Sequence, residues 1–278
     1  MKPLTGVSRA ATWLAAVEHL MTCSHWEDYN LVLEIAEPMR RNGFDRRVEE
    51  IVDAFLRKSE FFPLPTVAGT IFPAGEYRRH GPTGVYETYP DVIYPDIKKL
   101  TKDVTWGTYA HRLVRRQGPK GPINPLQICV EKIKKELAGT SVMTACYELS
   151  LSDLSVDLPI YEPGIDCNRR RGGPCLSHVS VKVTRQRRIQ LTALYRYHYY
   201  VQKALGNLMG LAHLQAFVCE QTKLEPGPLV CVSTFATLQE TGGVHKSAVE
   251  RLVASLRELK ADAGELSEEA GDQCDASD

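Results

Sequence analysis

The sequence lacks any long apolar run. Of its 278 residues, 43% are hydrophobic and 24% are charged, which are ordinary values for a globular protein and exclude collagen-like, coiled-coil and wholly disordered chains. No apolar stretch approaches the roughly 18 to 20 residues that span a bilayer. The first residues also lack the apolar region of a secretory signal, because Arg9 interrupts it early. We therefore expect a cytoplasmic protein with no membrane partner.

The chain also lacks a net charge, because 34 Lys and Arg balance 34 Asp and Glu. This balance is uneven: residues 262–278 hold seven acidic residues and no basic one, so residues 1–261 carry a formal charge of +7. An acidic segment with almost no large apolar side chain cannot offset its ordering entropy. We expect one folded domain over residues 1–261 and a disordered acidic tail over residues 262–278. The body lacks a repeated basic and aromatic surface, so nucleic acid is not an expected partner.

The eight cysteines lack the spacing of a metal or redox centre. No two of them form a Cys-x-x-Cys pair, which structural zinc sites commonly use. Cys129, Cys146 and Cys219 fit apolar patterns, and in a reducing compartment they are expected to be small core side chains. The sequence therefore predicts no metal site.

Hydrophobic periodicity predicts an α+β domain. Helical spacing of apolar residues predicts helices over residues 9–22, 28–40, 45–58, 124–139, 199–221 and 244–259. Strands are predicted over residues 142–149, 176–184, 189–197 and 229–238, the middle two as a hairpin. Residues 61–122 are rich in Pro, Gly and Tyr and are expected to be irregular. This order predicts a mixed sheet packed against long buried helices.

Cys175 differs from the other cysteines in its surroundings. It follows the segment RRRGGP at residues 169–174 and immediately precedes a predicted strand. Nearby guanidinium charge would lower the pKa of the thiol and favour the nucleophilic thiolate. Arg171 is accordingly a candidate ligand for an anionic substrate. A cysteine in an exposed turn beside solvated arginines is the alternative.

The order of four segments resembles the C-terminal half of thymidylate synthases: GGPCLSHVSVKV, LTALYR, GNLMGL and LEPGPLVCVSTFATLQ. That family places Pro-Pro-Cys-His before one strand and Tyr-Gln-Arg-Ser on the next, with an Asn eleven residues beyond the Arg. Pro174-Cys175 matches the first motif and Tyr195-Arg196 the second, and Asn207 stands eleven residues beyond Arg196. The segment WGTYAHR, at residues 106–112, is similar to a Tyr-Gly-x-Gln-Trp-Arg segment of the family. The resemblance covers residues 105–260, and residues 64–75 are a candidate for the family's first strand.

The resemblance implies a one-carbon transferase that uses 5,10-methylenetetrahydrofolate and a pyrimidine nucleotide. Cys175 would be the nucleophile that adds to C6 of the pyrimidine. Asn207 would hydrogen-bond the pyrimidine edge, and Arg196 would bind a phosphate. The resemblance also implies a homodimer that forms back to back through the sheets. Further candidates are Glu87 for the family's proton relay, and Tyr195 and Trp106 for the lining of the substrate cavity.

Departures from the family pattern point to an unusual substrate. Leu176 replaces the His after the nucleophile, and Tyr197 replaces the Ser after the phosphate-binding Arg. The family's deoxyribose-binding motif aligns with residues 237–239, and its paired arginines across the dimer interface align with residues 139–141. Neither motif is present at these positions of the sequence. We therefore expect a substrate other than ordinary deoxyuridylate and a methyl or hydroxymethyl product. Two alternatives stay open: an inactive relative that kept the fold and the dimer, and another cysteine enzyme, such as an acyl transferase using Cys175 and His178.

Overall fold

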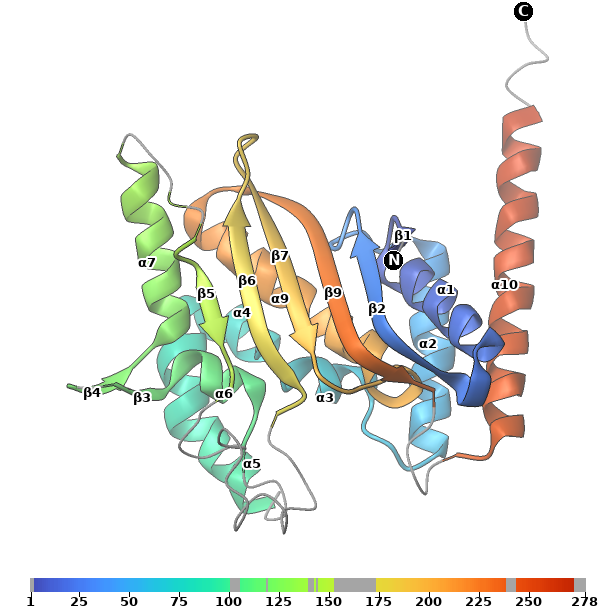
Figure 1. Cartoon of the computed structure of the whole chain (residues 1–278), viewed down its shortest axis with the longest axis horizontal. Helices are drawn as coiled ribbons and strands as arrows, with labels where there is room; N and C mark the ends of the chain where they lie inside the picture. The colour runs from blue at the N-terminus through green and yellow to red at the C-terminus, as the bar shows by residue number, and fades with distance from the viewer. Residues whose placement is uncertain are drawn as a thin grey trace, which may run out of the picture.

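A mixed β-sheet lies at the centre of the molecule, and helices pack against one of its faces (Figure 1). The computed structural model describes residues 3–100, 106–118, 120–139, 143, 145–152, 174–238 and 244–272, with residues 263–272 as backbone only. The strands of the sheet are β1 (Leu4–Gly6), β2 (Glu27–Ile35), β5 (Glu148–Ser150), β6 (Leu176–Val183), β7 (Arg188–Tyr195), β8 (His198–Tyr199) and β9 (Glu225–Thr237). Within the described ranges their order is β1-β2-β9-β7-β6-β5, with β8 pairing with β9. The expected combination of helices and a mixed sheet in one domain is confirmed.

The predicted hairpin and the long strand after it are confirmed. β6 and β7 pair antiparallel, with Leu176 opposite Tyr195 at one end and Val183 opposite Ile189 at the other. β9 runs between β2, to which it is antiparallel, and β7, to which it is parallel. Burial alternates along β7, because successive side chains of a strand point to opposite faces of the sheet.

The predicted helix over residues 28–40 is wrong, because most of this segment is strand β2. Leu31, Leu33 and Ile35 are buried, and the residues between them are only partly buried. This period of two is the pattern of a strand with one covered face. Pairing with β9 along nearly its whole length fixes β2 as an inner strand.

Four of the predicted helices are confirmed: α1 (Arg9–Thr22), α2 (Gly43–Lys58), α7 (Pro125–Leu137) and α9 (Leu205–Thr222). α7 begins as the sequence predicted, since the Asn124 side chain accepts a hydrogen bond from the Gln127 N–H and Pro125 occupies the first turn. In α2, Asn42 and Asp45 form a reciprocal capping box.

The expectation of irregular structure over residues 61–122 is wrong for most of the described residues there. The segment forms α3 (Leu64–Gly69), α4 (Ala74–Thr83), the π-helical η2 (Gly84–Ile93), α5 (Tyr94–Leu100), α6 (Tyr109–Val114) and a ribbon of β3 (Arg116–Gly118) and β4 (Gly121–Ile123). Pro65 lies in the first turn of α3, and Pro73 immediately precedes α4. Proline is tolerated at these positions. Residues 64–75 are therefore helical and are not the family's first strand.

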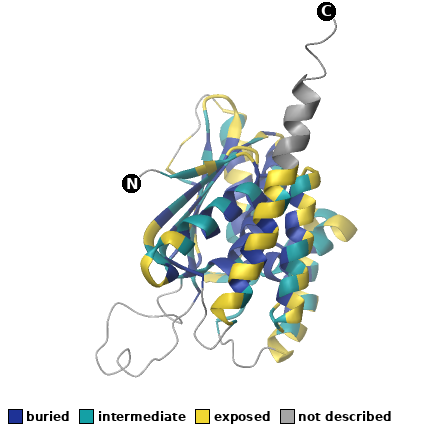
Figure 2. Cartoon of the chain, turned by 90° about the vertical axis from the view of Figure 1, so that its right-hand side faces the viewer, coloured by how far each residue is buried: buried dark blue, intermediate teal, exposed yellow. Residues whose placement is uncertain are grey.

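The core lies between the sheet and α9, where Figure 2 shows the buried residues concentrated. α9 is apolar around its whole circumference and is almost entirely buried. Gly206 and Gly210 let it approach α3 closely, because a Cβ atom at Gly210 would lie 2.6 Å from the backbone oxygen of Ala68. The opposite face of the sheet, toward the viewer in Figure 1, has none of the described helices over it.

The closing helix α10 (Lys246–Asp272) is longer than expected. It continues past residue 262, where the acidic tail was expected to begin, and the disorder expected of that tail stays a prediction. Ala, Glu and Leu, which favour helix formation, dominate this stretch. Residues 273–278 lie outside the described residues. Among the helices described, none combines the length and the hydropathy needed to span a bilayer.

Candidate active site

The hairpin of β6 and β7 brings Cys175 and Arg196 together. Cys175 is the residue before β6, and Arg196 is the residue after β7. The Arg196 backbone N–H donates to the Cys175 carbonyl oxygen at 2.9 Å. Two of the residues that carry the family resemblance, which stand far apart in the sequence, therefore meet at the open end of one hairpin.

The Cys175 thiol is half-buried next to two cationic side chains. Burial raises the pKa of the thiol, and the positive charges of Arg196 and Lys203 lower it by less, so the net shift is upward. The sequence predicted a lowered pKa because it considered the arginine run alone. Arg171 and the rest of that run lie outside the described residues.

Two tyrosines border the thiol from the interior. The phenol oxygen of Tyr109, on α6, accepts a hydrogen bond from the Leu176 N–H at 3.4 Å. Tyr195 is fully buried, and its hydroxyl has no hydrogen-bond partner among the described residues. After burial, the charges of Tyr109, Cys231 and Cys175 contribute to the raised pKa of Tyr195. A buried hydroxyl without a partner costs about 1–3 kcal/mol, and such a group is often explained by a ligand or water that would complete the site.

Asn207 belongs to a buried chain of hydrogen bonds that we call the His198 network (Asn207, His198, Ser233 and Tyr200). The Asn207 amide nitrogen lies 3.0 Å from His198 Nε2, and His198 Nδ1 lies 3.0 Å from Ser233 Oγ. Tyr200 Oη is 3.2 Å from the same Oγ. Burial lowers the pKa of His198 to about 3. The imidazole is therefore neutral, and it accepts from the amide through Nε2 if its proton is on Nδ1.

The His198 network joins the tyrosines beside the thiol through a ring stack. The rings of Tyr195 and His198 lie parallel, with centroids 4.0 Å apart. β7 ends at Tyr195, so Tyr197 and Tyr199 lie beyond this strand. Tyr197 and Tyr199 instead form their own ring pair, with centroids 4.9 Å apart.

A π-helical turn leads the chain from this stack into α9. The turn, η3 (Tyr200–Ala204), supplies Lys203 and Gln202, and the buried Gln202 Oε1 has no partner among the described residues. Its Tyr200 carbonyl accepts from the Trp13 indole N–H at 2.7 Å. π-Helical turns are often found at functional sites, and this one ends three residues before Asn207.

Trp106 lies beside Tyr109, with ring centroids 4.8 Å apart. Gly107 between them has a φ of +85°, and a Cβ atom there would overlap the Tyr94 hydroxyl, so this turn requires glycine. Arg112 donates through Nε to the Trp106 carbonyl at 2.9 Å. Trp106 is thus held next to the tyrosine that contacts the base of β6.

Two other candidates lie elsewhere. Glu87 is exposed on η2, and no contact with Cys175 is found among the described residues, so its role as a proton relay stays a prediction. His178 Nε2 pairs with a Glu148 carboxylate oxygen at 2.6 Å. This pair gives the imidazole a partner other than the thiol, which removes the main reason for an acyl transferase.

The sequence missed several residues that the fold brings to the site: Lys203, Ser233, Tyr200 and the His198 imidazole as the partner of Asn207. The position of His198 on the strand after Arg196 was the available signal. Ser233 gave none, because it alternates with apolar residues in β9 like any buried strand position.

No protein-family model matches this chain, and no curated protein matches it either. The relation to thymidylate synthases therefore depends on the residues themselves.

Proposed function

We propose that this protein is a thymidylate synthase-like transferase that moves a one-carbon unit from 5,10-methylenetetrahydrofolate to C5 of a pyrimidine nucleotide. The observation that carries the proposal is the grouping around Cys175: the Arg196 charge beside the thiol, and the buried, unpartnered Tyr195 hydroxyl next to it. Asn207 is joined to the same group through His198 and its stack on Tyr195.

Each residue would have a defined task. The Cys175 thiol would lose its proton to solvent, and the sulfur would add to C6 of the pyrimidine, which moves an electron pair toward O4. Asn207 would donate its second amide hydrogen to that oxygen and accept from the neighbouring ring N–H through its carbonyl oxygen. Its amide nitrogen is already held by neutral His198, so its carbonyl oxygen is oriented as an acceptor. After C5 bonds to the one-carbon unit, with tetrahydrofolate as the departing amine, the C5 proton would leave to solvent, and hydride or water would add to the transferred carbon as the Cys175 sulfur leaves.

The nucleotide half of the site fits better than the folate half. Arg196 and Lys203 lie close enough to the thiol to influence its pKa, and they would bind the phosphate. 5,10-Methylenetetrahydrofolate would supply the one-carbon unit, and hydride as well if the product is methyl. Trp106 offers a partly exposed ring against which its pteridine would stack. By the family resemblance, the folate-contacting Asp would fall near Tyr199 or Tyr200, which favours an altered mode of folate binding.

The inactive relative is the second candidate, and the raised pKa of Cys175 favours it. A thiol that stays protonated is a weak nucleophile until a ligand or a conformational change alters its surroundings. The missing ribose motif supports the same alternative. The two candidates differ in whether the bond between C5 and its hydrogen is ever broken.

The test is the release of tritium from C5. The full chain is incubated with 5,10-methylenetetrahydrofolate and pyrimidine nucleotides labelled at C5, both uracil and cytosine, ribo and deoxyribo. We expect release with at least one nucleotide, and a loss of at least about 10⁴-fold in Cys175→Ala. Cys146→Ser is the matched control, because Cys146 is another partly buried thiol but contacts Met143 at 3.7 Å.

Tyr195→Phe separates ligand binding from folding. Removal of an unpartnered buried hydroxyl should leave the stability of the free protein unchanged or slightly higher, and should weaken nucleotide binding about tenfold or more. If no nucleotide releases tritium, and Cys175→Ala binds the same nucleotides as the wild type, the transferase proposal fails and the inactive relative is supported.

We also propose that the protein is a homodimer joined through the uncovered face of the sheet. Thr192 lies near the middle of that face, between Ser180 on β6 and Val230 on β9. Thr192→Arg should convert the dimer to a monomer in sedimentation equilibrium. Leu100→Arg, at an 87% exposed position on α5, should leave the assembly unchanged, and a wild-type monomer would refute the dimer.

A further inference from the structure

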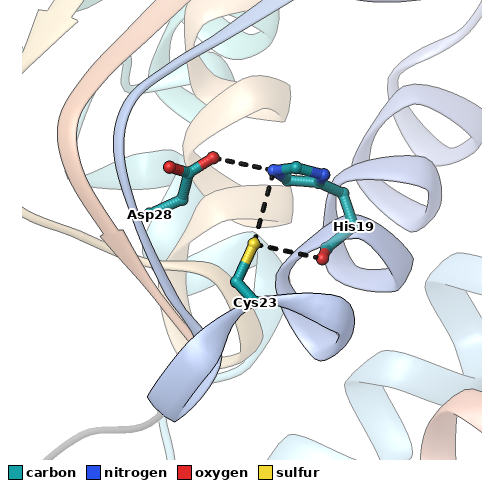
Figure 3. A group of neighbouring side chains, drawn as sticks. All are labelled: His19, Cys23 and Asp28. Atoms are coloured by element: carbon teal, nitrogen blue, oxygen red, sulfur yellow. Dashed lines mark hydrogen bonds and ion pairs between the residues drawn. The ribbon is translucent and has the colours of Figure 1, made fainter.

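A second group of reactive side chains lies at the end of α1, apart from Cys175 (Figure 3). His19 is in the last turn of α1, Cys23 caps the helix four residues later, and Asp28 is the second residue of β2. His19 Nε2, Cys23 Sγ and an Asp28 carboxylate oxygen all lie within 4.8 Å of one another. We call these three residues the rim cluster. All three are half-buried.

A tight turn makes this meeting possible. The short η1 (Ser24–Trp26) reverses the chain between the helix and the strand, and His25 and Trp26 have φ angles of 56° and 60°. Left-handed backbone is unfavourable for residues with a side chain. The fold therefore holds an uncommon conformation at the place that brings Asp28 opposite His19.

The distances in the rim cluster are close to those of a tetrahedral metal site. Typical zinc bond lengths place a thiolate sulfur about 3.6 Å, and a carboxylate oxygen about 3.3 Å, from a histidine nitrogen that shares the ion. Cys23 Sγ lies 3.6 Å from His19 Nε2, and Asp28 Oδ2 lies 2.7 Å from the same nitrogen. Of these two distances only the second has to open, by less than 1 Å, and the third, between sulfur and carboxylate oxygen, is no longer than 4.8 Å. As Figure 3 shows, the three side chains converge.

The surroundings of the rim cluster also favour a cation. The His19 carbonyl oxygen, in the last turn of α1, lies 3.5 Å from Cys23 Sγ, and the C-terminal end of a helix carries partial negative charge. The other Asp28 oxygen accepts from the Tyr29 N–H at 2.7 Å, a contact that orients the carboxylate as second-shell hydrogen bonds do in metal sites. Half-burial leaves room for solvent on the remaining side.

We propose that His19, Cys23 and Asp28 bind a divalent transition-metal ion of the zinc type, with water as the fourth ligand. Nitrogen, sulfur and oxygen together are the donors that zinc accepts, and three protein ligands with one open position are its usual open-site arrangement. The ion takes the place of the hydrogen between Nε2 and Oδ2, the ring proton moves to Nδ1 by a change of tautomer, and the thiol proton is released to solvent. The sequence predicted no metal site because it considered cysteine pairs, whereas this donor set uses one cysteine.

The ion would fix α1 to the start of β2. Asp28 pairs with Ala236 on β9, and Ala236 pairs with His198 on β8. The rim cluster and the His198 network therefore lie on one row of the sheet, that is, on a line of paired residues that crosses neighbouring strands. A metal ion bound by the rim cluster stabilises the end of this row at β2. This inference does not depend on the transferase proposal.

The test is a Co²⁺ titration of the full chain after treatment with a chelator. We expect a thiolate-to-cobalt charge-transfer band that saturates at one equivalent and is removed by Zn²⁺. Cys23→Ser should abolish the band, and His19→Ala and Asp28→Asn should each weaken Co²⁺ binding at least about tenfold. Zn²⁺ should raise the melting temperature of the wild type, because it binds only the folded state, and should not raise that of Cys23→Ser.

The matched controls are Cys146→Ser and His25→Asn. Cys146 is a partly buried thiol outside the rim cluster, and Asn tolerates the left-handed backbone of His25. Both variants should bind Co²⁺ as the wild type does. The proposal is overturned if no charge-transfer band forms, if the band survives Cys23→Ser, or if Cys146→Ser removes it. Circular dichroism identifies any variant that has not folded, and Asp28→Asn, which keeps the side-chain shape, then decides the outcome.

Discussion

The His198 network and the rim cluster lie on one row of the sheet, yet their two histidines have opposite surroundings. His198 is 2% exposed, stacked on Tyr195, and bonded through both ring nitrogens to uncharged partners. The His19 side chain is 36% exposed, and its Nε2 faces a carboxylate and a thiol. The same residue type is thus part of a fixed neutral network in one place and of a donor group for a cation in the other.

This difference shows that the groups around a histidine determine whether it positions another side chain or binds a ligand. Burial lowers the pKa of His198 and keeps it uncharged, and its hydrogen bonds to Ser233 and Asn207 use both ring nitrogens, so it serves to hold Asn207 in position. At His19, the Asp28 carboxylate, the Cys23 thiol and access to solvent allow a metal ion to take the place of the hydrogen on Nε2. His198 in the interior orients Asn207, and His19 in the rim cluster binds the metal ion.

The largest expected contrast between the two groups is in stability. Asn207→Ala leaves His198 Nε2 without its partner in the interior and creates a cavity, so we expect a loss of about 2–4 kcal/mol in the free energy of unfolding. His19→Ala, measured without metal, should cost less than about 1 kcal/mol, because the partly exposed pair with Asp28 is screened by water. Urea denaturation of the two variants measures both values. Equal losses would mean that the two histidines do not differ as described.

The second half of the fold was largely predictable from the sequence. Burial alternates along β7, along β6 from Val179 onward and along β9 as far as Ser233, and α9 is a long apolar run. These elements are buried by one another, so burial is visible in their residue pattern. The spacing between Cys175, Arg196 and Asn207 predicted their joint role, and the first two do meet at the hairpin end.

The first hundred residues were less predictable, for two physical reasons. β2 begins with four polar residues, Glu27 to Asn30, so alternation does not dominate its sequence, and its partner β9 lies about 200 residues away along the chain. The helices between residues 64 and 100 are short and contain several prolines, which sequence patterns associate with loops. The rim cluster depends on the turn at residues 24–26, so its three residues could not be grouped before the fold was known.

The smaller contrast between the two groups is in the response of stability to pH. Burial lowers the pKa of His198 to about 3, whereas a histidine in an unfolded chain titrates near 6.5. Below that value the unfolded chain binds a proton that the folded protein does not, so lowering the pH favours unfolding. From pH 7 to pH 5 this single group should remove about 2 kcal/mol of stability.

In His198→Gln that part of the loss should disappear, even though the variant starts from a lower stability. Between pH 7 and pH 9 the group is neutral in both states, so the curves of the wild type and the variant should run parallel there. Denaturation at a series of pH values measures both slopes, and parallel curves below pH 6 would show that His198 gains a proton in the folded protein and is not the fixed neutral member of the network.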